Sequence, residues 1–286
     1  MMENVYQQIA GKMSGMSKSH VRIATYILEN QTTAPFLTVG KLAKMAGVGD
    51  ATVVRFATTL GYSGYAEMQQ FMQSSVQKQL TTTERLKMSE EVYDKKSSGV
   101  YEVFQDDISN IQATMEKMDE QAFHQAVDSL VRARKVYIIA NRSATSLGVF
   151  LHYYLNIILK NSELLQSVEA SAEKLSDLEE EDVVIGISFS RYTKSTIQMF
   201  SYAREKKAAT IAITDNLLSP LVPHADIPLA ASSQMPSLID SFVAPLSLIN
   251  ALITFVGKEK QVDIHERLDV LEGIWDHFGV FDNWNK

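Results

Sequence analysis

Two arginines lie in polar loops that follow short apolar runs of the sequence, where they could bind an anion. Arg142 lies in Asn141-Arg142-Ser143, and Arg191 lies in Ser188-Phe189-Ser190-Arg191-Tyr192-Thr193. A guanidinium donates paired hydrogen bonds to a phosphate or a carboxylate, so two arginines that face one crevice predict an anionic ligand. They could equally form ion pairs with Asp215 or Asp240. We favour the interpretation as ligand contacts.

The side chains that commonly catalyse reactions form no recognisable group. The chain has no cysteine, which excludes disulfides, thiolate zinc sites and cysteine nucleophiles, and its six histidines stand far apart. Among the candidate bases, His152, His224 and Asp240 form no local pair. We expect His152 to lie on a helix, where it is packed or at a subunit interface. The sequence therefore predicts no catalytic residue, no metal ligand and no cofactor.

Residues 38–61 have the pattern of a helix-turn-helix. Thr38 is placed to cap a first helix, Gly47 to form the turn, and Val48 to fill the corner before a second helix that starts near Asp50. The apolar residues of the second helix share one face by their spacing: Val53, Phe56, Ala57 and Leu60. The alternative, a small helical hairpin with solvated polar residues, accounts less well for these coinciding features.

The opposite face of the second helix predicts contacts with DNA. A helix in the major groove contacts base edges through its N-terminal residues, so we expect Ala51, Thr52 and Arg55 to contact bases, with Thr58 on the same face. Asp50 would face phosphate unless it caps the helix. Further residues are placed to contact the DNA backbone: Lys41 and Lys44 on the first helix, and Tyr62, Ser63 and Tyr65 after the second.

The elements that position these residues change character along the chain. Residues 3–80 follow a helical period, 81–99 are polar and end in Ser-Ser-Gly, and 100–133 predict two helices. Beyond them, short apolar runs separated by helix-length segments predict a parallel sheet: 136–140, 164–168, 183–187, 210–214 and 227–230. Two helices are expected at roughly 238–257 and 262–278, and the apolar stripe of the last could pack within its domain or against a second subunit.

The chain of 286 residues is expected to form two domains. We predict an all-α helix-turn-helix head at 1–80, a linker at 81–99, and a three-layer α/β domain with a five-stranded parallel sheet at 100–286, whose binding crevice lies at the carboxyl ends of the strands. Residues 1–80 carry seven Lys/Arg and four acids, net +3, whereas the remainder carries 20 and 30, net −10. A mildly basic head suits DNA binding.

The sequence has no run of eighteen apolar residues and no apolar secretory signal, so we expect a cytoplasmic protein with no membrane contact.

Three motifs of the head resemble the N-terminal domain of the RpiR family of bacterial regulators. They are Leu42-Ala43 to Gly47-Val48, then Ala51-Thr52-Val53-Val54-Arg55-Phe56, then Leu60-Gly61-Tyr62-Ser63-Gly64-Tyr65. The resemblance covers essentially the whole chain, because the family places a SIS (sugar isomerase) domain after this head. Gly49 stands where the family usually has a serine cap, which leaves Asp50 as the expected cap.

The resemblance also implies where a ligand binds. In SIS domains a loop resembling Ser-x-Ser-Gly-x-Thr-x-Glu binds phosphate at a helix N-terminus. Here Ser188, Ser190 and Thr193 match, whereas Arg191 replaces the glycine and Ser195 the glutamate. The loop after the first strand resembles the other half of the site but lacks the family's glycines. The expected ligand residues are Asn141, Arg142, Ser143, Ser188, Ser190, Arg191, Tyr192 and Thr193.

These features together predict a DNA-binding transcriptional regulator, a repressor by the family's commoner mode. Its SIS domain would bind a small anionic effector, a phosphorylated sugar or derivative by resemblance, and the protein would act on a double-stranded DNA operator as a homodimer or tetramer. One alternative is a SIS-type sugar-phosphate isomerase, against which the missing glutamate argues. Another is a regulator whose SIS domain only dimerises, against which the two arginines argue mildly.

Overall fold

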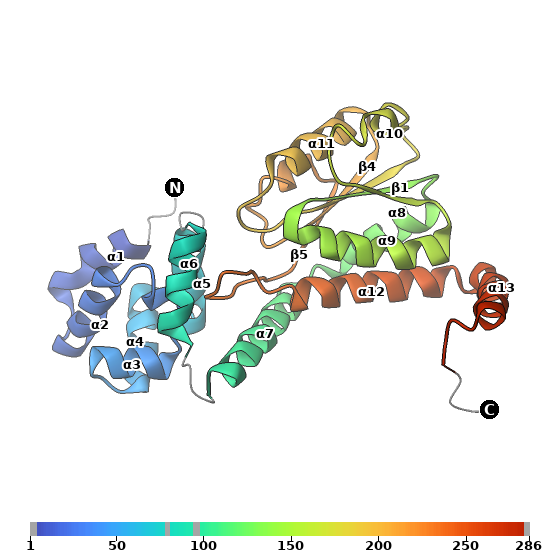
Figure 1. The fold of residues 1–286 in the computed structure, drawn as a ribbon. Helices are drawn as coiled ribbons and strands as arrows, with labels where there is room; N and C mark the ends of the chain where they lie inside the picture. Colours follow the sequence, from blue (N-terminus) through green and yellow to red (C-terminus); the bar gives the residue numbers. More distant parts are fainter. Residues whose placement is uncertain (1–4, 78–80, 94–97, 283–286) are drawn as a thin grey trace. The chain divides into compact units, whose positions relative to one another are not determined.

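The computed structural model describes residues 5–77, 81–93 and 98–282 (Figure 1). The chain divides into two compact units, Met1–Ser109 with Gln234–Ser241, and Asn110–Ser233 with Phe242–Lys286. Within the described residues, no helix is long and apolar enough to cross a bilayer. Nor does the described part of the chain hold a group of three or more His, Asp or Glu side chains that could bind a metal ion.

The first unit is built from helices around one apolar core. Its helices are α1 (Val5–Lys12), α2 (Lys18–Glu29), α3 (Val39–Ala46), α4 (Asp50–Leu60), α5 (Tyr65–Gln77), α6 (Thr82–Val92) and the first part of α7 (Ser98–Glu116) (Figure 1). Local signals set several of their ends. The Ser17 hydroxyl accepts a hydrogen bond from the His20 N–H and caps α2. Apolar residues of α1 to α6 then share one buried cluster.

Helix α6 occupies most of the segment 81–99, which the sequence predicted to be a linker. Thr81 and Glu84 form a capping box at its start, and Met88 and Val92 are buried in the core of the first unit. The linker prediction therefore does not hold for residues 82–92, and 94–97 lie outside the described residues. The segment is polar because most of α6 faces solvent, while a few of its side chains hold it to the core.

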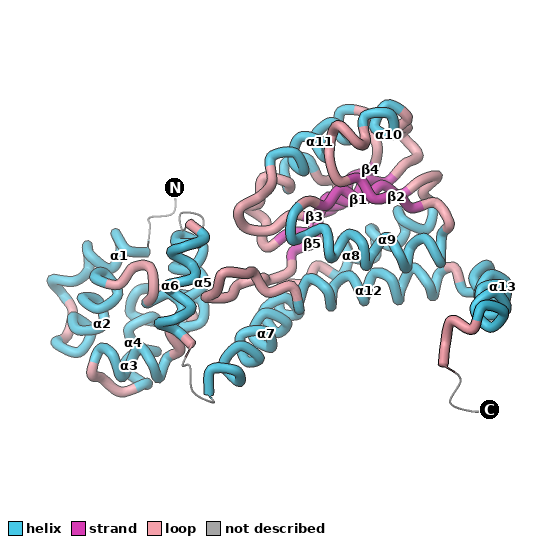
Figure 2. Tube along the Cα trace, viewed as in Figure 1, coloured by secondary structure: helices cyan, strands magenta, loops and turns pink. Residues whose placement is uncertain are grey.

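The second unit contains a five-stranded parallel sheet. Its strands lie in the order β2-β1-β3-β4-β5 and are β1 (Val136–Ala140), β2 (Ser162–Leu165), β3 (Val183–Ile187), β4 (Ala209–Thr214) and β5 (Ile227–Ala230) (Figure 2). The helices are the rest of α7, then α8 (Glu120–Arg132), α9 (Thr145–Leu159), α10 (Ala172–Ser176), α11 (Lys194–Glu205), α12 (Val243–Glu259) and α13 (Gln261–Phe278). The predicted all-α head and three-layer α/β domain are confirmed.

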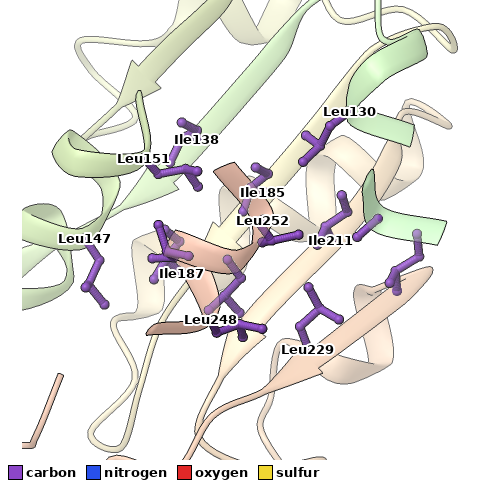
Figure 3. Packing of buried hydrophobic residues seen from close by; sticks show 14 of the residues in the cluster. Leu130, Ile138, Leu147, Leu151, Ile185, Ile187, Ile211, Leu229, Leu248 and Leu252 are labelled. Atoms are coloured by element: carbon purple, nitrogen blue, oxygen red, sulfur yellow. The ribbon is translucent and has the colours of Figure 1, made fainter. Parts of the chain in front are cut away.

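Helices cover both faces of the sheet, which is why its strands appear in the sequence as nearly continuous apolar runs. Helices α8, α9 and α12 cover one face, and α10 and α11 cover the other (Figure 1). Figure 3 shows the core on the face covered by α8, α9 and α12. There, leucines of the helices pack on apolar residues of the strands. The helix residues are Leu130, Leu147, Leu151, Leu248 and Leu252, and the strand residues are Ile138, Ile185, Ile187, Ile211 and Leu229. Burial of each such side chain contributes roughly 1.5–3 kcal/mol.

Two predicted elements differ from the structure by more than one residue. Strand β2 covers 162–165 rather than 164–168, in register with β1 from Val136↔Ser162. Helix α12 starts at Val243 rather than near 238, and residues 234–241 cluster with the first unit instead.

The apolar stripe of α13 is partly covered and partly exposed. Leu271 and Trp275 line a cavity of about 380 Å³ beside His152 of α9, whereas Ile274 and Phe278 are exposed.

Candidate nucleic-acid interface and ligand site

Helices α3 and α4 form the predicted helix-turn-helix. The Thr38 hydroxyl accepts a hydrogen bond of 3.3 Å from the Lys41 N–H and caps α3. Gly47 ends α3 with φ +64°, the left-handed conformation that favours glycine. Val48 packs partly buried against the core. Helix α4 begins after Gly49, and the described structure shows no side-chain hydrogen bond capping it. Asp50 is the first helical residue, so its expected role as the cap is wrong.

The expected base-contacting side chains lie on the open face of α4. Val53, Phe56, Ala57 and Leu60 are buried, which fixes the rotation of the helix. Ala51, Arg55 and Thr58 are exposed, and Thr52 is half-buried. The Thr58 hydroxyl donates to the Arg55 carbonyl at 2.9 Å. The N-terminal half of α4 therefore offers small side chains and one guanidinium to a partner.

The expected phosphate contacts fall into different environments. Lys44 and Ser63 are exposed. The Tyr62 hydroxyl donates to Gln8 Oε1 at 3.0 Å. Lys41 Nζ lies 2.7 Å from Glu102 Oε2, so that cation is already paired within the first unit.

Tyr65 is a structural residue rather than a phosphate contact. Its side chain is 4% exposed, and its hydroxyl donates to the Leu37 carbonyl at 2.7 Å. The prediction that Tyr65 contacts DNA is therefore wrong, because the first residue of α5 points into the core. Burial also raises the pKa of its hydroxyl above the ordinary value.

Arg22 is a further candidate contact that the sequence patterns did not indicate. Its guanidinium lies against Gly47, where any added side chain would collide with it. Arg22 is exposed and comes from α2. It therefore brings a cation to the turn between α3 and α4. No local pattern around residue 22 could have indicated this, because the proximity depends on how α2 packs on the helix-turn-helix.

The expected ligand residues of the second unit lie at a topological switch point of the sheet. β1 and β3 are adjacent, with Ala140 opposite Ile187, so the residues that follow both strands start side by side. The chain leaves β1 toward α9 on one face and leaves β3 toward α11 on the other (Figure 1). In open α/β sheets, ligands bind in the crevice outside such a point. The structure thus brings Asn141–Ser143 and Ser188–Thr193 to one edge.

Both arginines of this edge have left-handed backbones. Arg142 has φ 57° and Arg191 has φ 64°, a conformation that costs a residue with a side chain roughly 1–2 kcal/mol. These loops are the ones in which the related family carries glycines. The backbone therefore keeps a conformation suited to glycine while the side chain supplies a guanidinium. Strain of this kind clusters at functional sites.

The loop after β3 leads into the N-terminus of α11. Ser188 is buried and Ser190 is half-buried, whereas Arg191 and, in the other loop, Arg142 and Ser143 are exposed. Thr193 is the N-cap residue of α11, and no side-chain hydrogen bond caps the helix among the described residues. The N–H groups of a helix's first turn attract anions. This edge therefore combines a helix N-terminus with hydroxyls and guanidiniums.

Three further residues hold the expected ligand residues in place. The Tyr192 hydroxyl donates to Asp215 Oδ1 at 2.6 Å, and Asn216 Nδ2 donates to Asp215 Oδ2 at 2.8 Å. Burial raises the pKa of Asp215, and the hydrogen bonds partly offset this. Asn141 Nδ2 donates to the buried Thr196 hydroxyl at 2.8 Å. Asp215 thus bonds to Tyr192, while Asp240 lies in the first unit paired with Arg85.

The two units match two known domain families. Residues 3–79 match the model of the helix-turn-helix domain of the rpiR family, and residues 129–255 match that of the SIS domain. A helix-turn-helix joined to a SIS domain defines the protein as a transcriptional regulator. The chain therefore pairs a helix-turn-helix domain of the rpiR family with a SIS domain, the arrangement that its motifs predicted.

Relatives extend over nearly the whole chain. An uncharacterized helix-turn-helix-type transcriptional regulator of Caldanaerobacter subterraneus is 27% identical over 275 residues, which is 94% of this chain and 95% of that protein. The regulator HexR of Pseudomonas aeruginosa is 25% identical over 279 residues, 93% and 94% of the two chains. Both are named as regulators, which confirms the prediction of a regulator rather than an enzyme.

Solved structures share the fold. The sugar isomerase domain of an RpiR transcription factor from Sphaerobacter thermophilus has a TM-score of 0.60 at 25% identity and covers 62% of this chain and 99% of its own. The NanR protein of Vibrio vulnificus, complexed with ManNAc-6P, has a TM-score of 0.57 at 20% identity and covers 98% and 100% of the two chains.

Proposed function

We propose that this regulator binds a double-stranded DNA operator as a homo-oligomer and represses transcription, and that a small anionic metabolite changes its affinity for the operator. The observation that carries the proposal is the open N-terminal face of α4. Ala51 and Arg55 are exposed there on a helix whose rotation is fixed by its buried face. Arg55 can donate two hydrogen bonds to a guanine edge. Lys44 and Arg22 supply cations for the flanking phosphates.

The proposed effector is a phosphorylated sugar or derivative bound at the β1–β3 switch point. Support comes from Arg142 and Arg191, from the hydroxyls of Ser188 and Ser190, and from the N-terminus of α11. An anion there would accept hydrogen bonds from N–H, O–H and guanidinium donors at once. NanR, which shares the fold, is complexed with such a phosphorylated sugar.

Association of two chains would place two heads on one operator. A single helix-turn-helix contacts one half-site, so dimers bind half-sites one helical turn apart. The exposed apolar residues Val270, Ile274 and Phe278 of α13 support a face between subunits. The proposal leaves a dimer or a tetramer open, and analytical ultracentrifugation distinguishes them.

DNA binding is tested with duplexes from upstream of the gene and its neighbours, at fixed salt, by fluorescence anisotropy. Arg55→Ala is expected to weaken binding to the preferred site by about 1–3 kcal/mol and to relax its sequence preference. Arg22→Ala is expected to weaken binding to all sequences alike. It is also expected to reduce the slope of log affinity against log salt concentration by about 1. Arg132→Ala removes an exposed cation from α8 and is the matched control. No sequence preference in the wild type would overturn the proposal.

Effector binding is tested by thermal denaturation of the full chain with ManNAc-6P, other sugar 6-phosphates and inorganic phosphate. A ligand at 100 times its Kd stabilises the folded state by about 2.7 kcal/mol. Stabilisation of the wild type that is lost in Arg191→Ala supports the proposed site. No shift with any of these probes would favour a SIS domain that only dimerises, or a ligand of another class.

A further inference from the structure

A short segment of the second half of the chain belongs to the first unit. Residues Gln234–Ser241, here called the strap, lie between β5 and α12 in sequence, yet they cluster with the helical unit. Met235 and Ser241 are buried there, whereas Leu238 and Ile239 are exposed. The chain thus leaves the α/β unit after β5 and returns to it at α12, which packs on the sheet.

Arg85 of α6 holds the middle of the strap. Its Nη2 lies 2.6 Å from Asp240 Oδ1, and the two side chains are only 3% and 13% exposed. Nη2 also donates to the Ile239 carbonyl at 2.9 Å, and Nε donates to the Ser237 carbonyl at 2.9 Å. A buried guanidinium needs partners for its donors, so these contacts are costly to break one at a time.

Helix α6, which binds the strap through Arg85, also packs in the core of the helix-turn-helix. Met88 and Val92 of α6 belong to the same buried cluster as Leu42 of α3 and Phe56 of α4. Lys41 of α3 donates to the Val92 carbonyl at 2.5 Å. Displacement of α6 would therefore be felt by both helices of the helix-turn-helix, because close-packed cores transmit strain.

Helix α7 bonds to the last residue of the strap and to a residue just before its start. Ser241 Oγ donates to Asp107 Oδ1 at 2.5 Å. Just before the strap, Ser232 Oγ donates to Asn110 Oδ1 at 2.7 Å, and the Ser232 N–H donates to Thr114 Oγ1 at 2.9 Å. Contacts with α7 thus flank the strap, and α6 binds its middle.

A path of hydrogen bonds and adjacent chain runs from the candidate ligand site to the residues just before the strap. The Tyr192 hydroxyl donates to Asp215, whose neighbour Thr214 ends β4. The Thr214 carbonyl accepts the N–H of Ala231 at 2.8 Å, three residues before the strap begins. A change in the loop after β3 can therefore reach the strap through adjacent strand ends.

We propose that the strap couples the ligand site to the DNA-binding helices, with Arg85 as the positioning residue that transmits the change through α6. The inference rests on the proposed function of both sites. Coupling is reciprocal, so DNA bound to the head must alter the ligand site just as a ligand alters DNA binding. DNA can therefore serve as the probe without knowledge of the effector.

The test is hydrogen–deuterium exchange of the full chain with and without its operator duplex. In the wild type, DNA is expected to change exchange in residues 141–146 and 188–193 by about fivefold or more, the lower end of usual couplings. Asp240→Asn is expected to lose this change while keeping its operator affinity. The double variant Arg85→Met with Asp240→Leu removes both charges, so no unpaired buried charge compromises folding. Lys87→Ala, exposed on α6, is the matched control.

The outcomes separate the two claims. The inference is supported if the wild type and Lys87→Ala respond to DNA while both strap variants bind DNA but no longer respond. It is overturned if the strap variants respond as the wild type does, or if the wild type binds DNA without any response. Absence of saturable DNA binding by the wild type overturns the proposed function itself, and the strap then has nothing to transmit.

Discussion

Replacing Arg191 separates the two roles that the structure gives this residue, a strained backbone and a cationic side chain. Its φ of 64° costs roughly 1–2 kcal/mol for a residue with a side chain. The substitution Arg191→Gly removes that cost, but it also makes the unfolded chain more flexible, which lowers the free energy of unfolding by about 0.4–1 kcal/mol. Arg191→Gly is therefore expected to be about 1 kcal/mol more stable than Arg191→Ala, because the alanine variant keeps the strain.

The assay is calorimetric unfolding of the full chain, followed by ligand titration. A difference of 1 kcal/mol corresponds to roughly 2–4 °C in Tm for a unit of this size. Both variants are expected to lose the stabilisation by sugar phosphates, since both lack the guanidinium. Lys160→Gly is the matched control, since Lys160 is an exposed cation with φ 65° at the end of α9. It should gain stability without changing ligand binding.

Two results would refute this reasoning. If Arg191→Gly is less stable than Arg191→Ala, the backbone carries no strain that glycine relieves. If both variants bind sugar phosphates as the wild type does, the guanidinium does not contact the ligand, and the arginine at this position has no role in recognition.

Three further predictions concern the core and pH. Gly186→Ala would place a methyl group 2.7 Å from the ring of Phe200 and is expected to destabilise the α/β unit by about 1–3 kcal/mol in urea denaturation. Tyr65→Phe is expected to cost about 0.5–1.5 kcal/mol of stability while leaving operator affinity unchanged; weaker DNA binding would restore Tyr65 as a contact. Burial raises the pKa of the Asp215 carboxyl above its ordinary value of 3.8. The free energy of unfolding of the wild type should therefore fall relative to that of Asp215→Asn as the pH rises from near 4 through the raised pKa. A difference between the two proteins that does not depend on pH would contradict this prediction.

The sequence by itself determined the elements whose signals are local. Thr38, Gly47 and Val48 lie within ten residues of one another, so cap, turn and corner of the helix-turn-helix follow from neighbouring residues. The strands are predictable for a related reason. A strand buried on both faces must be apolar along its length, and 136–140 and 183–187 agree with the structure to the residue. The edge strand 227–230, whose burial alternates, agrees as well.

Tertiary structure alone decided which polar residues meet. Arg85 and Asp240 are 155 positions apart. The segment around Arg85 was predicted to be a linker and that around Asp240 to begin a helix, so neither local pattern indicates the pair. Arg22 reaches the turn, and Tyr65 turns inward, only through the packing of other helices. The two ligand loops meet because β1 and β3 pair. Local sequence patterns encode which face of a helix or strand is buried, whereas the element that packs against this face depends on the fold of the whole chain.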